Sequence, residues 1–272
     1  MYNESEARRL VIEAGHRLLE NRLIARTWGN ISARVSDTEF VITPSGRAYD
    51  TLKPEELVKV NMLDLSYEGD VKPSSEKGIH AHAYILRKDV DFVIHTHQHY
   101  ASAVAAEGLD VEGIPCAGYG LPGTGKLKSA VSLSIAMHPE AKAFLMAKHG
   151  ALCLGSDIED AFAVAEELEA KCRTIFTERV GDIRDFEAEY AKNHSFLPAY
   201  IDDYAQLVGV IAKLNYGVVK TPASDDPEAV EMIVQKNCAA ALYVRASKPM
   251  GILDGALQRV VYLKKYSKQK NA

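Results

Sequence analysis

The 272-residue chain has little cysteine, and what it has is dispersed. Its four cysteines are Cys116, Cys153, Cys172 and Cys238, and no two of them form a CxxC pair. Small disulfide-stabilised domains carry dense and regularly spaced cysteines, so this distribution excludes a disulfide framework. It favours reduced thiols in a cytoplasmic protein.

Long hydrophobic runs and basic blocks are also absent from the sequence. No apolar stretch approaches the ~18 residues that a membrane span needs. The formal net charge is −5, so nucleic-acid binding has little electrostatic support. With 47% hydrophobic and 25% charged residues, the composition is typical of a soluble globular protein. The first twenty residues are charged and amphipathic, which predicts a first helix and not a signal peptide.

The spacing of apolar residues predicts an α/β protein. Helical periodicity predicts helices over residues 5–22, 73–89, 101–106, 126–138 and 157–176. Short β-rich runs predict strands at 39–46, 57–62 and 90–97, and two strands around a turn at 141–155. The segment TWGNIS (27–32) is a turn that leads into a further strand. Because strands and helices alternate without strict βαβ regularity, we expect a mixed sheet.

Three histidines fall within HTHQHY, residues 95–100, after the apolar pair Val93-Ile94. On a strand, residues two apart share a face, so His95 and His97 can point together. This geometry suits two imidazoles on one cation, although a solitary HxH is more often surface decoration. His99 follows where the strand is expected to give way to a turn.

Two residues elsewhere could complete a metal site. His149 precedes Gly150 at an expected strand end, and Glu76 would add an anionic oxygen. Three neutral imidazoles and a carboxylate suit zinc or a similar divalent ion. His80 and His82 point about 200° apart on a helix, so they cannot share a site. His80 lies one turn from Glu76 and could support a ligand, but a packed or solvated role is more usual for both.

Small polar turns indicate anion binding. Asn30, the pair Ser45-Gly46 and the pair Ser74-Ser75 combine close backbone approach with hydroxyl and amide donors. Each alone is weak, because turns are built from these residues, and Ser74-Ser75 could simply cap a helix. The possible anion site and the possible ligand Glu76 are adjacent in sequence.

The ordered motifs GNIS, ITPSG, SSE, HTH, IPCAGYG and HG resemble those of the class II aldolase/adducin family over about residues 5–180. The resemblance implies a three-layer α/β/α sandwich around a mixed, largely antiparallel sheet, formed by residues 1–180. Residues 181–272 would then be a C-terminal helical extension packed on the same domain or on a neighbouring subunit. Family enzymes are commonly homotetramers with active sites between subunits.

The resemblance also implies roles for individual residues. His95, His97 and His149 match zinc ligands, one ion per chain, whereas His99 does not. Glu76 matches a glutamate that both binds the metal and acts as the catalytic acid/base. The remaining matches, to a substrate-phosphate pocket, are Thr27, Gly29, Asn30, Ser45, Gly46, Ser74 and Ser75.

The implied activity is a zinc-dependent aldolase that reversibly cleaves a sugar 1-phosphate to dihydroxyacetone phosphate and an aldehyde. Alternatives are a pentulose-phosphate 4-epimerase, a methylthioribulose-phosphate-type dehydratase and a non-catalytic adducin-like scaffold. Epimerases of the family usually carry Asp where this chain has Glu76, which favours carbon–carbon cleavage. The loop tyrosine of some family aldolases has no counterpart. Tyr119 is nearby but occupies a different place in the motif, and Tyr200, Tyr204 or Tyr216 could supply the missing hydroxyl. The sequence does not identify the aldehyde product.

Overall fold

The computed structural model describes residues 1–180 apart from 22, 25–28, 106–109, 121 and 148. Within this part of the chain the strands form one seven-stranded sheet in the order β3-β2-β1-β4-β7-β6-β5. Neighbouring strands are antiparallel except β5 and β6, which are parallel. The predicted mixed, largely antiparallel sheet is therefore confirmed. The strands are β1 (Asn30–Arg34), β2 (Glu39–Ile42), β3 (Val58–Asn61), β4 (Phe92–Thr96), β5 (Cys116–Ala117), β6 (Ala143–Met146) and β7 (Gly150–Gly155).

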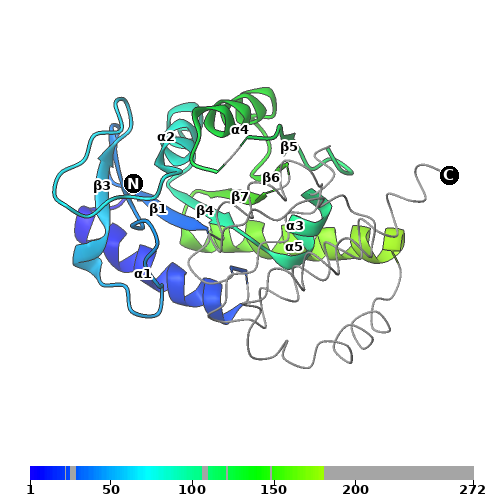
Figure 1. Cartoon of the computed structure of the whole chain (residues 1–272), viewed down its shortest axis with the longest axis horizontal. Coiled ribbons are helices and arrows are strands. Elements are labelled where there is room, and N and C mark those ends of the chain that lie inside the picture. The colour runs from blue at the N-terminus through cyan, green and yellow to red at the C-terminus, as the bar shows by residue number, and fades with distance from the viewer. Residues whose placement is uncertain (22, 25–28, 106–109, 121, 148, 181–272) are drawn as a thin grey trace, which may run out of the picture.

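Helices cover both faces of this sheet (Figure 1). On one face lie α2 (Lys77–Leu86) and α4 (Gly125–Met137), and on the other α1 (Glu4–Glu20), α3 (His99–Ala105) and α5 (Ile158–Val180). A single 3-10 turn among the described residues, η1, spans Pro54–Glu56. Each face has its own hydrophobic core, so the architecture is the expected three-layer sandwich. None of the helices described is long and apolar enough to cross a bilayer.

The period of two along β4 decides which face receives its histidine. Phe92 and Ile94 pack in the core beneath α1 and α5, whereas Val93 packs in the core beneath α2 and α4. His95 continues the series of Val93 and therefore lies on the face that α2 covers. The central position of β4, between β1 and β7, places this residue deep inside the domain.

The predicted helices and strands are found close to their expected positions, with two differences. The short strand β5 was not predicted, because two residues carry no periodic signal. The strand β4 ends at Thr96, so His97 lies just beyond it, and the prediction that both histidines stand on the strand is wrong. The expected C-terminal extension lies outside the described residues, as do Thr27, Tyr200, Tyr204 and Tyr216.

Candidate metal centre and active site

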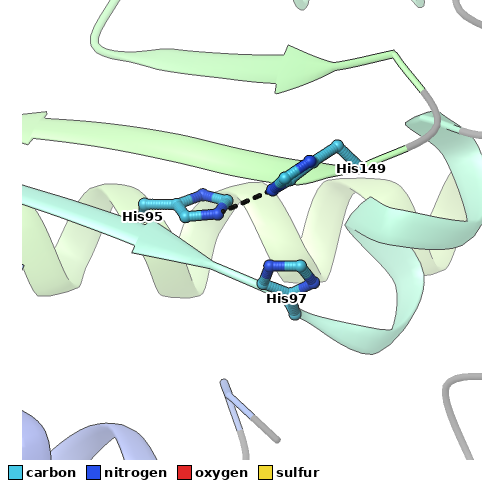
Figure 2. Close-up of side chains that lie close together, drawn as sticks. All are labelled: His95, His97 and His149. Atoms are coloured by element: carbon cyan, nitrogen blue, oxygen red, sulfur yellow. Dashed lines mark hydrogen bonds between the residues drawn. The ribbon is translucent and has the colours of Figure 1, made fainter. Parts of the chain in front are cut away.

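The structure brings three histidines together at the end of β4 (Figure 2). Ring nitrogens of His95, His97 and His149 all lie within 4.8 Å of one another. His95 comes from β4, His97 follows that strand, and His149 precedes β7. His95 and His149 are buried, whereas His97 is partly exposed. Three imidazoles that converge on one point, with one of them accessible, are suited to hold a metal ion that also reaches a substrate.

Hydrogen bonding fixes which nitrogen of His95 faces this point. Its Nδ1 lies 2.8 Å from the carbonyl oxygen of Ala151, on the neighbouring strand β7. A carbonyl only accepts, so Nδ1 carries the proton and Nε2 presents a lone pair. That Nε2 lies 3.0 Å from Nε2 of His149. Two imidazole nitrogens this close require a proton or a cation between them, which fits a metal site.

Glu76 completes the group from the start of α2. Its Oε2 lies 3.2 Å from Nε2 of His95, and its Oε1 lies 3.5 Å from Nε2 of His149. Oε1 is buried and has no hydrogen-bond partner among the described residues. Burial opposes ionisation of this carboxyl, but His95, His149 and a hydrogen bond from Asn30 outweigh it and lower its pKa to about 2. The donor set of three imidazoles and one anionic oxygen therefore fits a divalent cation.

Two glycines allow neighbouring backbone to approach the end of β4. A Cβ on Gly29 would lie 2.4 Å from the carbonyl oxygen of His95. A Cβ on Gly150 would lie 2.3 Å from the carbonyl oxygen of Thr96. Gly29 also has a φ of +83°, which L-residues rarely adopt. Gly29 was predicted as part of a phosphate pocket, and the structure adds a packing requirement for it.

Two of the expected phosphate residues, Asn30 and Ser74, form hydrogen bonds with Glu76. The backbone N–H of Ser45 donates to Lys72 O at 2.9 Å, and that of Ser74 donates to Thr43 O at 3.0 Å, so the two turns run side by side. Ser45, Gly46 and Ser75 are exposed, whereas Asn30 and Ser74 are buried. The hydroxyl of Ser74 accepts from the backbone N–H of Glu76 at 3.2 Å. Ser74 therefore stabilises the turn that leads into α2. The N-cap of this helix is Glu76, without a side-chain cap hydrogen bond, so the interpretation of Ser74-Ser75 as a helix cap is wrong.

Helix α5 fixes the segment that follows His97. The side-chain amide of Gln98 donates to the carbonyl oxygen of Ala165. The carboxylate of Glu169 accepts from the backbone N–H groups of Tyr100 and Ala101 at 2.8 and 2.9 Å. These first N–H groups of α3 have no partner within a helix, so Glu169 both caps α3 and anchors the turn after the metal group.

Sequence reasoning missed a buried polar cluster behind Glu76. His80 contacts Asn30 and Ser32 through its two ring nitrogens, and Ser32 contacts Tyr84. His80 is packed, as expected, but it is also connected to the site, because its partner Asn30 forms a hydrogen bond with Glu76. His82, by contrast, bonds Ser132 of α4, which confirms that the two histidines do not share a site. The sequence pattern that could have indicated this cluster is the spacing of four between polar residues on α2 and of two between polar residues on β1.

Comparison with known proteins gives a consistent result. Residues 9–176 match the Class II Aldolase and Adducin N-terminal domain. The chain is 32% identical over 186 residues to 5-deoxy-D-ribulose 1-phosphate aldolase of Bacillus thuringiensis serovar kurstaki, covering 63% of this chain and 85% of that protein. It is 31% identical over 181 residues to L-fuculose phosphate aldolase of Haemophilus influenzae, covering 61% and 81%.

Solved structures show the same similarity. An L-fuculose 1-phosphate aldolase aligns with a TM-score of 0.57 at 28% identity, covering 63% of this chain and 84% of that chain. The L-fuculose-1-phosphate aldolase of Thermus thermophilus aligns with a TM-score of 0.50 at 25% identity, covering 62% and 92%. The family match over residues 9–176 includes the histidine group and Glu76.

Proposed function

Because the chain belongs to the class II aldolase and adducin family, we propose that it is a metal-dependent aldolase acting on a sugar 1-phosphate. The products of cleavage would be dihydroxyacetone phosphate and an aldehyde. Two similar proteins are named as aldolases of phosphorylated sugars, which supports this reaction class. The observation that carries the proposal is the carboxylate of Glu76, which reaches toward both His95 and His149.

His95, His97 and His149 would hold the metal, with Glu76 as a fourth ligand in the absence of substrate. Zinc is the proposed ion, since imidazole nitrogen and carboxylate oxygen are its usual ligands. When bound, the ion would supply Lewis-acid stabilisation of negative charge on substrate oxygens. The partial exposure of His97 leaves a side of the group that a substrate can reach.

Glu76 is the proposed acid/base. It is ionised at neutral pH and lies beside Asn30 and Ser74 of the proposed phosphate pocket. A sugar phosphate held by Asn30, Ser45, Ser74 and Ser75 would therefore place its nearest carbons beside this carboxylate. In the condensation direction, Glu76 removes a proton from the carbon next to the carbonyl of dihydroxyacetone phosphate. In the cleavage direction it returns that proton.

We also propose that residues 181–272 pack as a helical extension on this domain or on a neighbouring subunit of a homotetramer. Chain length beyond a complete sandwich of about 180 residues supports this proposal, because extensions of symmetric oligomers often cover a neighbour.

Hydrogen exchange tests the reaction without knowledge of the aldehyde. The zinc-loaded protein in deuterated water should exchange one specific hydrogen of dihydroxyacetone phosphate, observed by proton NMR. Glu76→Gln should slow this exchange by ~10²–10⁴, the usual contribution of a positioned acid/base. Glu140→Gln is the matched control, because the Glu140 side chain is 76% exposed.

The outcomes separate the competing functions. Absence of exchange by the zinc-loaded wild type would contradict the aldolase and favour the epimerase or dehydratase. Undiminished exchange in Glu76→Gln would retain the aldolase but move the base to another group, with Tyr119 as the first alternative.

A further inference from the structure

We propose that His80 is a positioning residue that orients the side-chain amide of Asn30, so that its NH₂ group faces both Glu76 and the substrate phosphate. The part that concerns substrate rests on the proposed function. The part that concerns orientation rests on a chain of hydrogen bonds that runs from α2 to β1 and back. The hydrogen bonds of His80 among the described residues go to Ser32 and Asn30 and not to the histidine group, and in this proposal His80 does not contact the substrate.

The chain of hydrogen bonds has four links. Tyr84 OH lies 2.7 Å from Ser32 Oγ, and Ser32 Oγ lies 2.6 Å from His80 Nδ1. His80 Nε2 lies 2.5 Å from Asn30 Oδ1, and Asn30 Nδ2 lies 3.1 Å from Glu76 Oε2. Ser32, His80 and Tyr84 are fully buried, and Asn30 and Glu76 are nearly so, at 5% and 6% exposed. Water therefore has little access to replace any link.

The chemistry of the groups decides which atom donates and which accepts in each of these hydrogen bonds. A carboxylate only accepts, so the NH₂ group of Asn30 must face Glu76, and the amide oxygen must face His80. His80 then has to donate from Nε2. As a neutral imidazole it accepts at Nδ1 from the hydroxyl of Ser32. That hydroxyl has no further proton, so it must accept from Tyr84.

The periods of helix and strand make this alternation possible. Glu76, His80 and Tyr84 are four residues apart, so they share one face of α2 with a rise of about 6 Å between them. Asn30 and Ser32 are two apart on β1, with a rise of about 6.6 Å and side chains on the same face. The nearly equal steps let the two strand residues fit between successive helix residues, as the hydrogen bonds show.

The series of hydrogen bonds ends at Tyr84 without reaching solvent, which argues that it orients side chains and does not conduct protons. Tyr84 is fully buried, and burial raises its pKa, so it remains neutral. A proton leaving Glu76 along this route would reach no solvent-exposed group in it. The series of hydrogen bonds therefore fixes the orientation of these side chains.

The orientation matters because Asn30 lies beside anions. Its amide has two N–H groups, and Glu76 occupies one. The other is then available to a phosphate in the proposed pocket. Without a donor at position 80, the amide of Asn30 could rotate. Its oxygen would then face the Glu76 carboxylate and the substrate phosphate, both of which are anions. The buried oxygen would also lose its partner.

The experiment uses inorganic phosphate as the probe, because its binding needs no catalysis. Calorimetry on the zinc-loaded full chain should give a dissociation constant about 10-fold higher for His80→Leu than for wild type, as expected when a buried partner is removed. His80→Gln should restore binding to within about 2-fold, because the Gln amide can donate from the Nε2 position. His82→Leu is the matched control on the same helix and should bind phosphate as wild type does.

A measurement on wild type covers the case in which His80→Leu does not fold. Nitrogen-15 NMR of the imidazoles should show His80 as the Nε2–H tautomer, with Nδ1 unprotonated. The Nδ1–H tautomer would overturn the proposal, as would unchanged phosphate binding by folded His80→Leu or failure of wild type to bind phosphate. Normal phosphate binding with this tautomer, but no exchange on dihydroxyacetone phosphate, would refute the aldolase and leave the positioning role intact.

Discussion

Acid should destabilise this protein through His80. Burial, together with nearby His95, lowers the pKa of its imidazole from 6.5 to about 3, and Glu76 offsets only part of this. Between these two values the unfolded chain binds a proton at this position that the folded chain does not. The free energy of unfolding is therefore unaffected above pH 6.5, and falls as the pH is lowered from there toward about 3.

The magnitude follows from the same difference. One extra proton on the unfolded chain changes the free energy of unfolding by about 1.4 kcal/mol per pH unit. From the unperturbed pKa down to about pH 5, the loss is then about 2 kcal/mol. Domains have only about 5–15 kcal/mol in total, so this loss is measurable.

Urea unfolding at a series of pH values, with saturating zinc throughout, measures the effect. His80→Gln keeps a donor for Asn30 but cannot titrate, so its stability should fall less steeply with acid than that of wild type. The pH dependence of zinc binding is common to both proteins and cancels in their difference. His138→Gln, at a partly exposed position, provides the reference for a His-to-Gln exchange. Parallel curves for wild type and His80→Gln across this range would refute the assignment of His80 as a buried neutral imidazole.

Three further outcomes are expected. Purified wild type should carry about one divalent ion per chain by elemental analysis, lost in His95→Ala and kept in His99→Ala; stoichiometric zinc in the His95 variant would exclude this site. Ser75→Ala should raise KM for a phosphorylated substrate by an amount worth ~1–3 kcal/mol, and wild-type KM together with equal turnover of unphosphorylated sugars would contradict the phosphate pocket. Truncation after residue 180 should reduce assembly or activity, and a truncated protein that stayed tetrameric and fully active would show that the extension is dispensable.

Apolar periodicity predicts the helices, the strands and a mixed sheet, whereas the three-layer sandwich was expected from the resemblance to the class II aldolase/adducin family. The strand that holds His95 and the helix that follows Glu76 both lie where apolar spacing places them. The grouping of His95, His97 and His149 was expected from motif order, and the structure brings these residues together. What periodicity could not give is the end of β4 at Thr96, because a strand ends where pairing with its neighbours ends.

The supporting residues depend on contacts between elements, which a single sequence does not specify. The spacing of His80 from Glu76 suggested support for a ligand, but its partners Asn30 and Ser32 are evident only once α2 is placed against β1. Ser32 reads as one polar residue in a strand. The tight approach at Gly29 and Gly150 likewise requires knowledge of which backbone passes beside them. Sequence therefore identified residues that stand out by type, and missed those whose role depends on a partner.

The matched spacing of α2 and β1 also limits how this gene can change in length. One codon inserted between Glu76 and Tyr84 would rotate the rest of the helix by about 100°, and one inserted between Asn30 and Ser32 would turn the following side chains to the opposite face. Either insertion would separate side chains of α2 and β1 that form hydrogen bonds with each other, and no single substitution elsewhere could restore these bonds. Insertions and deletions that survive in descendants of this sequence should therefore fall outside both segments, even where individual residues within them are exchanged.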